Sequence, residues 1–464
     1  METIFDFMYP KKKITKPIRL IEFFAGYGSQ ALALKYLGVP FEHWKICEWA
    51  VKSIQAYKDI HFPNVFEHPL AFINISKEQL VDALYKKGVS SNYNEPMAKE
   101  QLNRLSEYQL QTIAENCHIT HNLVNIQQVK GEDLEIVDTD KYEYIMTYSF
   151  PCQDLSLAGK GKGMSDTSTR SGMLWEVERI LTECKELGTL PQILLMENVP
   201  QVHGTDNVKD FNKWQLRLEE LGYKNYFQDL IATDYGIPQK RNRCFMVSIL
   251  GEYSYTFPKP IPLKLKLKDM LEDNVDEKYY LSDKTLAQIS NWNSYQNPLD
   301  NVMGKESISP TITTRIAESQ DGGINASMKV YCENLEKTTN LRIRNATKQG
   351  YLEATDGDGI DISSRMEYHR GNVQKDKIQT LTTSGGNDRG VVNSDLRIRK
   401  LTPKECFRLM GVKDEDYEKC AKNQSDSSLY HLAGDSIVVN VLMAIFGELL
   451  DIDWQTKFKE MKGE

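Results

Sequence analysis

The residue best suited to chemistry is Cys152, which stands between Pro151 and Gln153 in the stretch YSFPCQDLSLAGKGKGM. A cysteine thiolate is a strong nucleophile, and the glycines and lysines that follow are typical of a flexible loop over a substrate. Most cysteines are small buried apolar residues that do no chemistry. A catalytic role for Cys152 therefore requires that the fold bring other reactive side chains to it.

Three charged residues further along the chain are candidate partners of the thiol. Glu197 follows a buried apolar run, residues 192–196, where burial would raise its pKa and let it carry a proton at neutral pH. Arg241 and Arg243 alternate in IPQKRNRCF, so an extended chain would point both to one face. Arginines there suit a phosphate or a carbonyl oxygen of a base, although surface ion pairs are the commoner explanation.

Strands must deliver these side chains to one edge of a sheet. Residues 142–150 form an apolar, aromatic run typical of a buried strand, and Pro151 cannot continue its hydrogen-bond ladder. Cys152 would then follow the carboxyl end of this strand, and a helix over residues 171–187 would lead to the strand before Glu197. Ligands bind outside the carboxyl ends of the strands in open α/β sheets.

A cofactor site is indicated by the run IRLIEFFAGYG at residues 18–28. It predicts a strand, a turn with Gly26 and Gly28, and a helix over residues 30–37, which is how nucleotide or nucleoside cofactors are held. A functionless turn between strand and helix would look the same.

The next strand, residues 44–47, ends at Glu48 and Trp49. An acidic residue about 20 positions after the glycine turn binds ribose hydroxyls in such folds, although an ordinary surface glutamate fits the same position. A third edge is expected at residues 129–134, with Asp133.

The rest of the chain predicts two lobes. Residues 1–256 form a catalytic and cofactor-binding domain, interrupted at about residues 70–128 by a helical insertion in which we see no chemistry. Broken apolar periods and many Pro, Gly, Ser and Thr residues predict a smaller, loop-rich β lobe over residues 257–395. Residues 396–464 return to the first lobe.

Two helices are expected in that returning segment. A basic helix over residues 397–412 is opened by Thr402 and Pro403, and residues 433–450 form a helix that is apolar almost all round and must be buried.

Composition excludes several other classes. No apolar run approaches a membrane span and the first residues lack the order of a signal peptide, so we expect an intracellular, cytoplasmic protein. Eight cysteines without a CxxC pair argue against a disulfide framework and a zinc site. The net charge of −8 argues mildly against nucleic acid as a partner, but net charge is a poor guide to a local basic patch.

The chain contains seven motifs in a fixed order: FAGYG, CEW, FPCQDLS, MENV, IPQKRNR, RKLTPKECFRLMG and AGDSIVVNVL. Together they strongly resemble the motifs of the cytosine-5 DNA methyltransferases of the bacterial and phage restriction–modification type. The resemblance covers nearly the whole chain apart from the insertion and much of the 257–395 lobe. It implies a Rossmann-like S-adenosylmethionine-dependent methyltransferase domain (α/β) with a second, smaller, loop-rich β target-recognition domain.

The resemblance assigns catalytic roles residue by residue. Cys152 matches the nucleophile, and Glu197 the carboxyl group that contacts the flipped cytosine at ring nitrogen 3 and its exocyclic amine. Arg241 and Arg243 match the arginines that hold the base and its phosphate. The loop that closes over DNA supplies the DNA contacts, Gln153, Ser156, Lys160 and Lys162.

For the cofactor S-adenosylmethionine, the resemblance implies contacts from the glycine turn, the ribose and adenine sites, the methyl donor's flank and the methionine part, namely Phe24, Gly26, Gly28, Glu48, Trp49, Asp133, Pro151 and Asp435. Three residues depart from the family's pattern. Glu22 stands in place of aspartate, Ser29 in place of glycine, and Asp435 in place of asparagine, which leaves the contact of Asp435 open.

The implied chemistry suits these residue types. A thiolate that adds to carbon 6 turns the cytosine ring into an enamine, whose carbon 5 can attack the methyl of a sulfonium. A carboxyl at ring nitrogen 3 stabilises the charge that develops, a base removes the carbon-5 proton, and the cysteine leaves. The base must first be flipped out of the duplex.

The resemblance implies that the protein acts as a monomer on double-stranded DNA, with no metal and no membrane. Three alternatives are weaker: a tRNA cytosine-5 methyltransferase of the same fold, a catalytically silent DNA-binding relative, and a cysteine hydrolase. The recognition sequence, and whether a cognate restriction endonuclease exists, stay open.

Overall fold

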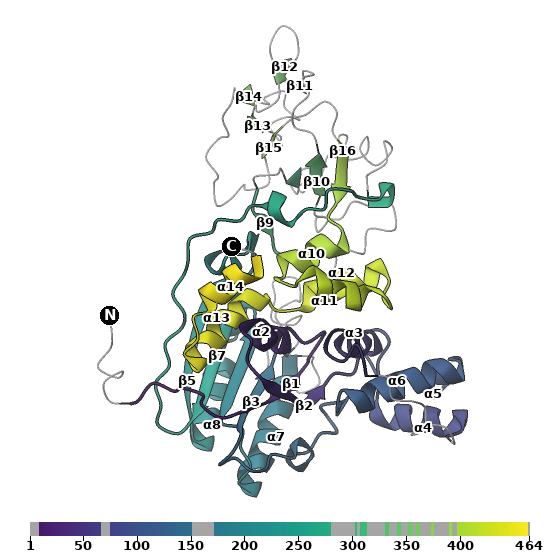
Figure 1. Cartoon of the computed structure of the whole chain (residues 1–464), viewed down its shortest axis with the longest axis vertical. Coiled ribbons are helices and arrows are strands. Elements are labelled where there is room, and N and C mark those ends of the chain that lie inside the picture. Colours follow the sequence, from purple (N-terminus) through teal and green to yellow (C-terminus); the bar gives the residue numbers. More distant parts are fainter. Residues whose placement is uncertain are drawn as a thin grey trace.

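The computed structural model describes residues 9–65, 75–150, 171–279 and 401–462, with residues 302–303 and 307–312 and seven short strands between residues 330 and 400. At its centre is a mostly parallel sheet covered by helices on both faces, in agreement with the predicted α/β fold class (Figure 1). The strands of this sheet are β1 (Ile18–Phe23), β2 (Phe41–Cys47), β3 (Glu143–Tyr148), β4 (Ile193–Asn198), β5 (Tyr223–Ile231) and β7 (Asn242–Leu250).

The sheet has the order β2-β1-β3-β4-β7-β5, and β7 runs antiparallel to the other five strands. The chain passes outward from β1 to β2 and then returns to the other side of β1 with β3. This reversal between β1 and β3 is the point of an open α/β sheet at which ligands bind.

The register aligns the carboxyl ends of four strands. Phe23 of β1 is opposite both Cys47 of β2 and Tyr148 of β3, and Tyr148 is opposite Met196 of β4. Glu197 follows this row of residues by one position, as Glu48 does. The two predicted carboxylates therefore lie along the same edge.

Alternating residues of the strands build a core on each face of the sheet. Ile18 and Leu20 belong to the cluster that packs under α2 (Ser29–Leu37) and α13 (Val439–Leu450). Ile21 and Phe23 belong to the cluster under α7 (Leu174–Leu187) and α8 (Val208–Leu221). Burial on both faces explains why the central strands β3 and β4 are largely apolar.

The returning segment packs on the first lobe, as the sequence predicted, but the prediction of its elements was wrong in two places. Residues Arg397–Lys400 form strand β16 rather than the start of a helix, because Thr402 caps helix α10 (Pro403–Leu409) and accepts a hydrogen bond from the Glu405 amide. The buried C-terminal helix is divided into α12 (Asp426–Asp435) and α13, because the backbone is extended at Ser436.

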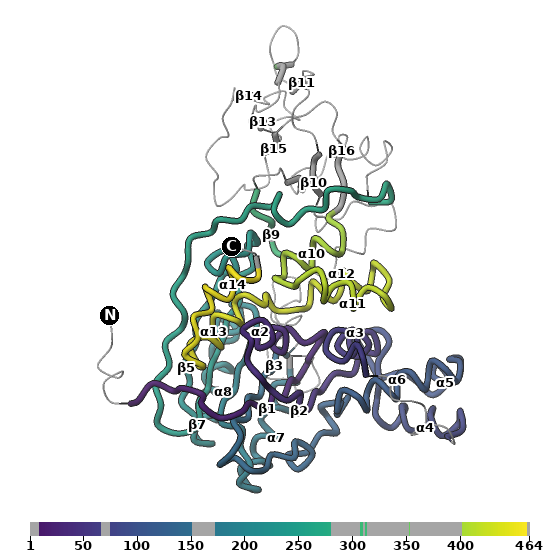
Figure 2. The backbone as a smooth tube through the Cα atoms, in the orientation of Figure 1, coloured from purple at the N-terminus to yellow at the C-terminus, as the bar shows by residue number. Residues whose placement is uncertain are grey.

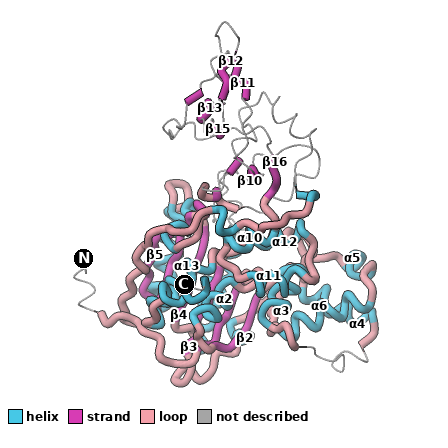
Figure 3. Tube along the Cα trace, turned by 45° about the horizontal axis from the view of Figure 1, so that its top comes forward, coloured by secondary structure: helices cyan, strands magenta, loops and turns pink. Residues whose placement is uncertain are grey.

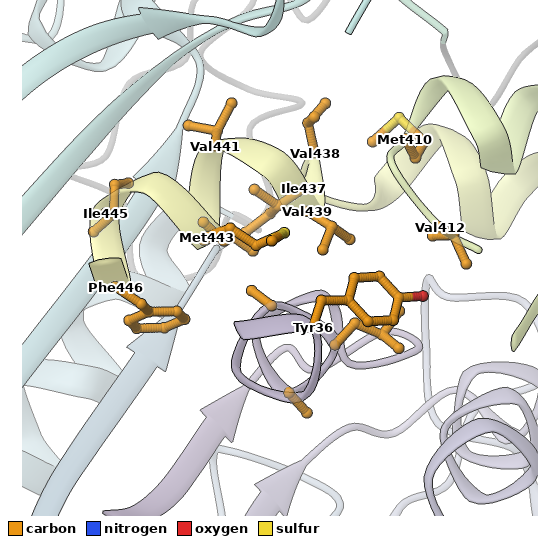
Figure 4. Packing of buried hydrophobic residues seen from close by; sticks show 14 of the residues in the cluster. Tyr36, Met410, Val412, Ile437, Val438, Val439, Val441, Met443, Ile445 and Phe446 are labelled. Atoms are coloured by element: carbon orange, nitrogen blue, oxygen red, sulfur yellow. The ribbon is translucent and has the colours of Figure 1, made fainter. Parts of the chain in front are cut away.

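Helix α13 covers α2 through a continuous apolar contact, in which Tyr36 of α2 lies under Val439 and Met443 (Figure 4). By length and composition, Asp426–Leu450 is apolar enough to cross a membrane, which the sequence analysis did not anticipate, but 89% of its apolar window is buried inside the protein. Such burial is typical of a core helix. Helices α11 (Asp414–Ala421) and α14 (Trp454–Lys462) complete this segment.

The insertion is helical, as predicted, and lies beside α3 (Val51–His61) at one side of the sheet (Figure 3). Its helices are α4 (Lys77–Lys87), α5 (Lys99–Asn103) and α6 (Glu107–Ile119). They share a small core of their own, which includes Leu80, Leu84 and Leu110.

Short 3-10 turns connect several of these elements: η2 (Gly131–Leu134), η3 (Ser171–Met173), η4 (Pro200–His203), η5 (Ala232–Tyr235), η6 (Leu267–Met270) and η7 (Glu277–Tyr279). The predicted third edge at residues 129–134 is thus the turn η2 and not a strand.

The predicted second lobe contributes short strands at one end of the molecule (Figure 1). Figure 2 shows the returning segment, in yellow, packed on the purple helix α2 of the first lobe. They are β8 (Val302–Met303), β9 (Ser309–Pro310), β10 (Val330–Glu333), β11 (Leu341–Arg344), β12 (Tyr351–Ala354), β13 (Gly359–Asp361), β14 (Val373–Gln374) and β15 (Arg389–Val391). β9 pairs with β6 (Gln239–Lys240), which directly precedes β7 and so ties this lobe to the central sheet. The domain boundaries stay a prediction.

Candidate active site

The edge formed by β4 and β7 brings together two of the predicted catalytic residues. The Nε of Arg243 lies 3.1 Å from Oε1 of Glu197, and both side chains are largely buried. Burial raises the pKa of Glu197, which Arg243 and Arg241 partly offset and Asp435 increases. The carboxyl group is thus placed, as predicted, to hold a proton at higher pH than an exposed glutamate.

The chain enters the predicted nucleophile segment beside this pair. Asn198, the residue after Glu197, donates from its Nδ2 to the carbonyl oxygen of buried Phe150 at 3.0 Å. The predicted residues of the loop itself lie outside the described residues; they are Pro151, Cys152, Gln153, Ser156, Lys160 and Lys162.

Arg241 does not share the position of Arg243, contrary to the prediction that both arginines hold the base and its phosphate. Its guanidinium is buried and donates to three backbone carbonyl oxygens, of Ile312 at 2.9 Å, Gly434 at 3.0 Å and Ser436 at 2.7 Å. A buried guanidinium needs acceptors, and the break between α12 and α13 supplies two of them. Arg241 therefore joins the catalytic edge to the second lobe and the returning segment.

Replacing Arg241 with methionine is expected to lower the free energy of unfolding by about 3 kcal/mol, because it leaves three buried carbonyls without their charged donor. Urea unfolding followed by circular dichroism measures the change. Arg104→Met, on the exposed surface of the insertion, is the matched control and should change stability by less than about 0.5 kcal/mol. Equal stabilities of the two variants would contradict the role given to Arg241.

The glycine turn after β1 has the backbone geometry of a ligand-binding turn. Phe24, Gly26 and Gly28 all have positive φ, at 56°, 55° and 82°. A Cβ added at Gly26 would meet no atom within 4 Å, whereas one at Gly28 would collide with His61 and Tyr57. Gly28 is therefore required by packing, and Gly26 borders open space that a ligand can enter.

Glu48 closes this turn. Its Oε2 accepts from the Gly26 amide at 3.0 Å and its Oε1 from the Ala50 amide at 2.8 Å. Asn122 holds the backbone of Glu48 from both sides, since its Oδ1 accepts from the Glu48 amide and its Nδ2 donates to the Glu48 carbonyl. Sequence reasoning missed Asn122, because no local pattern connects it with a residue 74 positions earlier.

Three carboxyl groups share the electrostatics of this edge. Burial raises the pKa of Glu48 to about 7, and the charge of Asp435 adds to that increase, as it does for Glu197. Asp435 is the last residue of α12 and lies 3.1 Å from His431. Three carboxyl groups at one edge, beside the open space at Gly26, favour a cationic ligand, and the sulfonium and ammonium of S-adenosylmethionine fit that requirement.

The two other predicted cofactor residues, Trp49 and Asp133, lie in different places. Trp49 follows Glu48 on the same edge and packs against the core of the insertion. Asp133 is a correction: it lies on η2, where its carboxylate accepts from the Lys130 amide. The turn packs so closely against Glu183 and Cys184 in the last turns of α7 that a Cβ at Gly131 would collide with them. That end of α7 leads toward the amino end of β4, so Asp133 is remote from the glycine turn.

Glu22, one of the departures from the family's pattern, supports the turn from inside the core. It is fully buried, accepts from the Tyr57 hydroxyl at 2.5 Å and from the Ala31 amide at 3.3 Å, and so joins β1 to α3 and α2. Burial raises its pKa to about 7, although both hydrogen bonds oppose the shift. Ser29, another departure, is buried at the start of α2.

The pKa of Glu22 predicts a stability that falls as pH rises. Between its ordinary pKa of 4.5 and about 7, only the folded state holds the proton, so the free energy of unfolding decreases by about 1.4 kcal/mol per pH unit over that window. Glu22→Gln stays neutral and should not lose this stability. The difference in free energy of unfolding between Glu22→Gln and the wild type should therefore shift in favour of the variant by on the order of 2 kcal/mol between pH 5 and pH 8. Urea unfolding at both pH values measures this difference; Glu186→Gln, on the exposed face of α7, should show none.

A doubly covered α/β sheet, a glycine turn with a buried carboxylate at its switch point, and a carboxyl–arginine pair on the next strands define a Rossmann-like methyltransferase. The family model of C-5 cytosine-specific DNA methylases matches residues 100–451. The chain belongs to this family and is a DNA cytosine-5 methyltransferase. Members of the family take the methyl group from an S-adenosylmethionine-type donor.

Individual relatives agree with this assignment. The chain is 30% identical to the type II methyltransferase M2.ScrFI of Lactococcus lactis subsp. cremoris, over 93% of this chain and 99% of the relative. It is 29% identical to the orphan methyltransferase M.SssI of Spiroplasma monobiae, over 94% and 98%. The crystal structure of the Dnmt2 methyltransferase of S. pombe has the same fold, with a TM-score of 0.54, 15% identity and coverage of 93% of this chain and 98% of that one.

Proposed function

We propose that this protein methylates carbon 5 of a flipped-out cytosine in a specific sequence of double-stranded DNA, through a covalent adduct of Cys152. The thiolate forms a bond to carbon 6 of the ring, and Glu197 donates a proton to ring nitrogen 3, so the added negative charge is neutralised. Removal of the carbon-5 proton and departure of the sulfur then restore the double bond. S-adenosylmethionine, when bound, supplies the electrophilic methyl group.

The pair of Glu197 and Arg243 is the observation that carries this proposal. Burial favours the protonated form of Glu197, and the adjacent guanidinium stabilises the carboxylate that forms when the proton leaves. A carboxyl that can hold its proton and an arginine that compensates its loss suit a ring nitrogen that becomes basic during the reaction.

The cofactor is assigned to the turn at Phe24, Gly26 and Gly28, with Glu48 and Trp49 for the ribose and adenine, Pro151 beside the methyl donor, and Asp435 near the methionine part. The open space beside Gly26 and the buried carboxyl group of Glu48, whose pKa burial raises, support this assignment. We propose that Glu48 uses its free lone pairs for ribose hydroxyls.

The lobe of residues 257–395 is proposed to read the DNA sequence, with Lys160, Lys162, Gln153 and Ser156 contacting DNA from the loop. Two contacts support a fixed position of this lobe at the catalytic edge: the pairing of β9 with β6, and the hydrogen bond from Arg241 to Ile312. We propose a cytoplasmic protein that acts as a monomer and without a metal.

The test is transfer of labelled methyl from S-adenosylmethionine to duplex DNA of random sequence, with tRNA as the alternative substrate. The proposal expects label in DNA only, in 5-methylcytosine, and bisulfite sequencing of DNA methylated in a host would then show a single sequence context. Label in tRNA, or in another base of DNA, would contradict it.

A further inference from the structure

The helical insertion reaches the cofactor edge through the loop between α4 and α5. Ser90 of this loop forms a parallel bridge with Ala50: the Ser90 amide donates to the Trp49 carbonyl at 2.7 Å, and the Val51 amide donates to the Ser90 carbonyl at 2.9 Å. The loop is thus attached to the backbone of Trp49 and Val51, just after Glu48. The insertion is therefore part of the wall of the site, although its sequence showed no chemistry.

Side-chain hydrogen bonds hold the loop rigidly around one aromatic residue. Oγ of Ser90 donates to the Glu95 carbonyl at 2.7 Å, and Oδ1 of Asn92 accepts from the amides of Asn94 and Glu95 at 2.9 and 3.2 Å. Tyr93 lies inside this turn with a φ of 62°. The left-handed conformation is unfavourable for a residue with a large side chain, and such strain is kept mainly at functional positions.

The side chain of Tyr93 joins the insertion to the returning segment across the edge. Its ring packs on His431 of α12, with ring centroids 4.0 Å apart. Burial raises the pKa of its hydroxyl, and the charges of Glu48 and Asp435 add to that increase. The loop that carries Tyr93 is bonded to Trp49, the residue after Glu48, and Nε2 of His431 lies 3.1 Å from Oδ2 of Asp435. Tyr93 is therefore near the carboxylate assigned to the ribose and the one assigned to the methionine part.

We propose that Tyr93 is a cofactor-binding residue contributed by the insertion, and that its ring forms the wall between Glu48 and Asp435 against which the cationic nucleoside binds. An aromatic ring flanked by carboxylates favours a sulfonium or ammonium group, because the ring face and the carboxylates both attract positive charge. This inference rests on the proposed assignment of the cofactor to the turn at Gly26.

Tyr93→Gly is the sharpest variant, because glycine accepts a positive φ and preserves the backbone of the loop while the ring is removed. Isothermal titration calorimetry of the full chain with S-adenosylmethionine should show about tenfold weaker binding. The KM for S-adenosylmethionine should rise by a similar factor while kcat changes by less than about twofold. Tyr93→Phe, which keeps the ring, should bind within about threefold of the wild type.

Tyr108→Ala is the matched control, because Tyr108 lies on the same insertion but is 77% exposed. This variant should bind S-adenosylmethionine with the same affinity as the wild type. Tight binding by Tyr93→Gly would overturn the inference, as would a loss of kcat without a change in KM. If Tyr93→Gly does not fold, Tyr93→Leu, which keeps an apolar side chain without an aromatic face, decides in its place: unchanged affinity overturns the inference. A wild-type protein that binds no S-adenosylmethionine would instead refute the proposed function.

Discussion

Replacing Cys152 with alanine is expected to reduce methyl transfer to DNA by at least about 10,000-fold while S-adenosylmethionine still binds. Without the thiolate, nothing adds to carbon 6 of the cytosine, and carbon 5 stays too weak a nucleophile to react. Tritium transfer from labelled S-adenosylmethionine to duplex DNA measures the first quantity, and calorimetric titration with the cofactor measures the second. Alanine removes one sulfur atom only, so the cofactor turn at Gly26 should be unaffected.

Cys184→Ala provides the matched control, because this thiol is buried in α7 against the turn at Gly131 and has no part in the proposed reaction. It should keep methyl transfer within about twofold of the wild type. Retention of transfer by Cys152→Ala would refute the adduct, whereas loss of both transfer and cofactor binding would show that the substitution had damaged the fold.

Glu197→Gln is expected to lower kcat by about 100- to 10,000-fold, which is the usual contribution of a positioned general acid. Glutamine keeps the size of the side chain and can donate a hydrogen bond to ring nitrogen 3, but it cannot transfer a proton. The KM for DNA should change far less than kcat, because the lost interaction is strongest after the thiolate has added.

The pH dependence separates proton transfer from simple packing at this position. Burial holds the pKa of Glu197 above its ordinary value, so the protonated carboxyl is available below that pKa and is lost as pH rises through it. The wild-type kcat should therefore fall at high pH, and this fall should be absent in Glu197→Gln. A variant with unchanged kcat, or with the same pH profile as the wild type, would contradict the assigned role.

The strands that lead to the catalytic edge and the position of the carboxylates could be predicted because both follow from local patterns. A strand that is buried on both faces must be apolar along its whole length, so residues 143–148 and 193–196 were recognisable from the sequence. Glu197 was recognisable because it is the first charged residue after such a run, and Glu48 because it ends the second strand about 20 positions after the glycine turn. The sheet then brings their ends together by its parallel register.

The errors concern residues whose role depends on distant parts of the chain. The pattern of alternation placed Arg241 with Arg243, but the acceptors that determine its position come from Ile312, Gly434 and Ser436. Those same hydrogen bonds accompany the break between α12 and α13, which an uninterrupted apolar run hid. Asp133 was misplaced because an acidic residue before a strand looks the same whether or not it lies near the cofactor edge.

The insertion illustrates a further limit. Tyr93 lies in a polar stretch without periodicity, and its proximity to Glu48 depends on a backbone bridge between Ala50 and Ser90 and on a ring contact with His431. The sequence contains no signal for either contact. A positive φ at a tyrosine is visible only in the structure, and it is the observation that singled out this residue.

The central claim is that the sulfur of Cys152 bonds to the cytosine ring during catalysis. It is tested most directly with random-sequence duplex DNA that contains 5-fluorocytosine, incubated with the protein and S-adenosylmethionine. Fluorine at carbon 5 cannot leave as a cation, so the adduct cannot release its sulfur and should survive denaturation. Mass spectrometry of the digested complex should locate the nucleotide on Cys152. Methylation of ordinary DNA without a trapped adduct, or a link to any other residue, would contradict the mechanism.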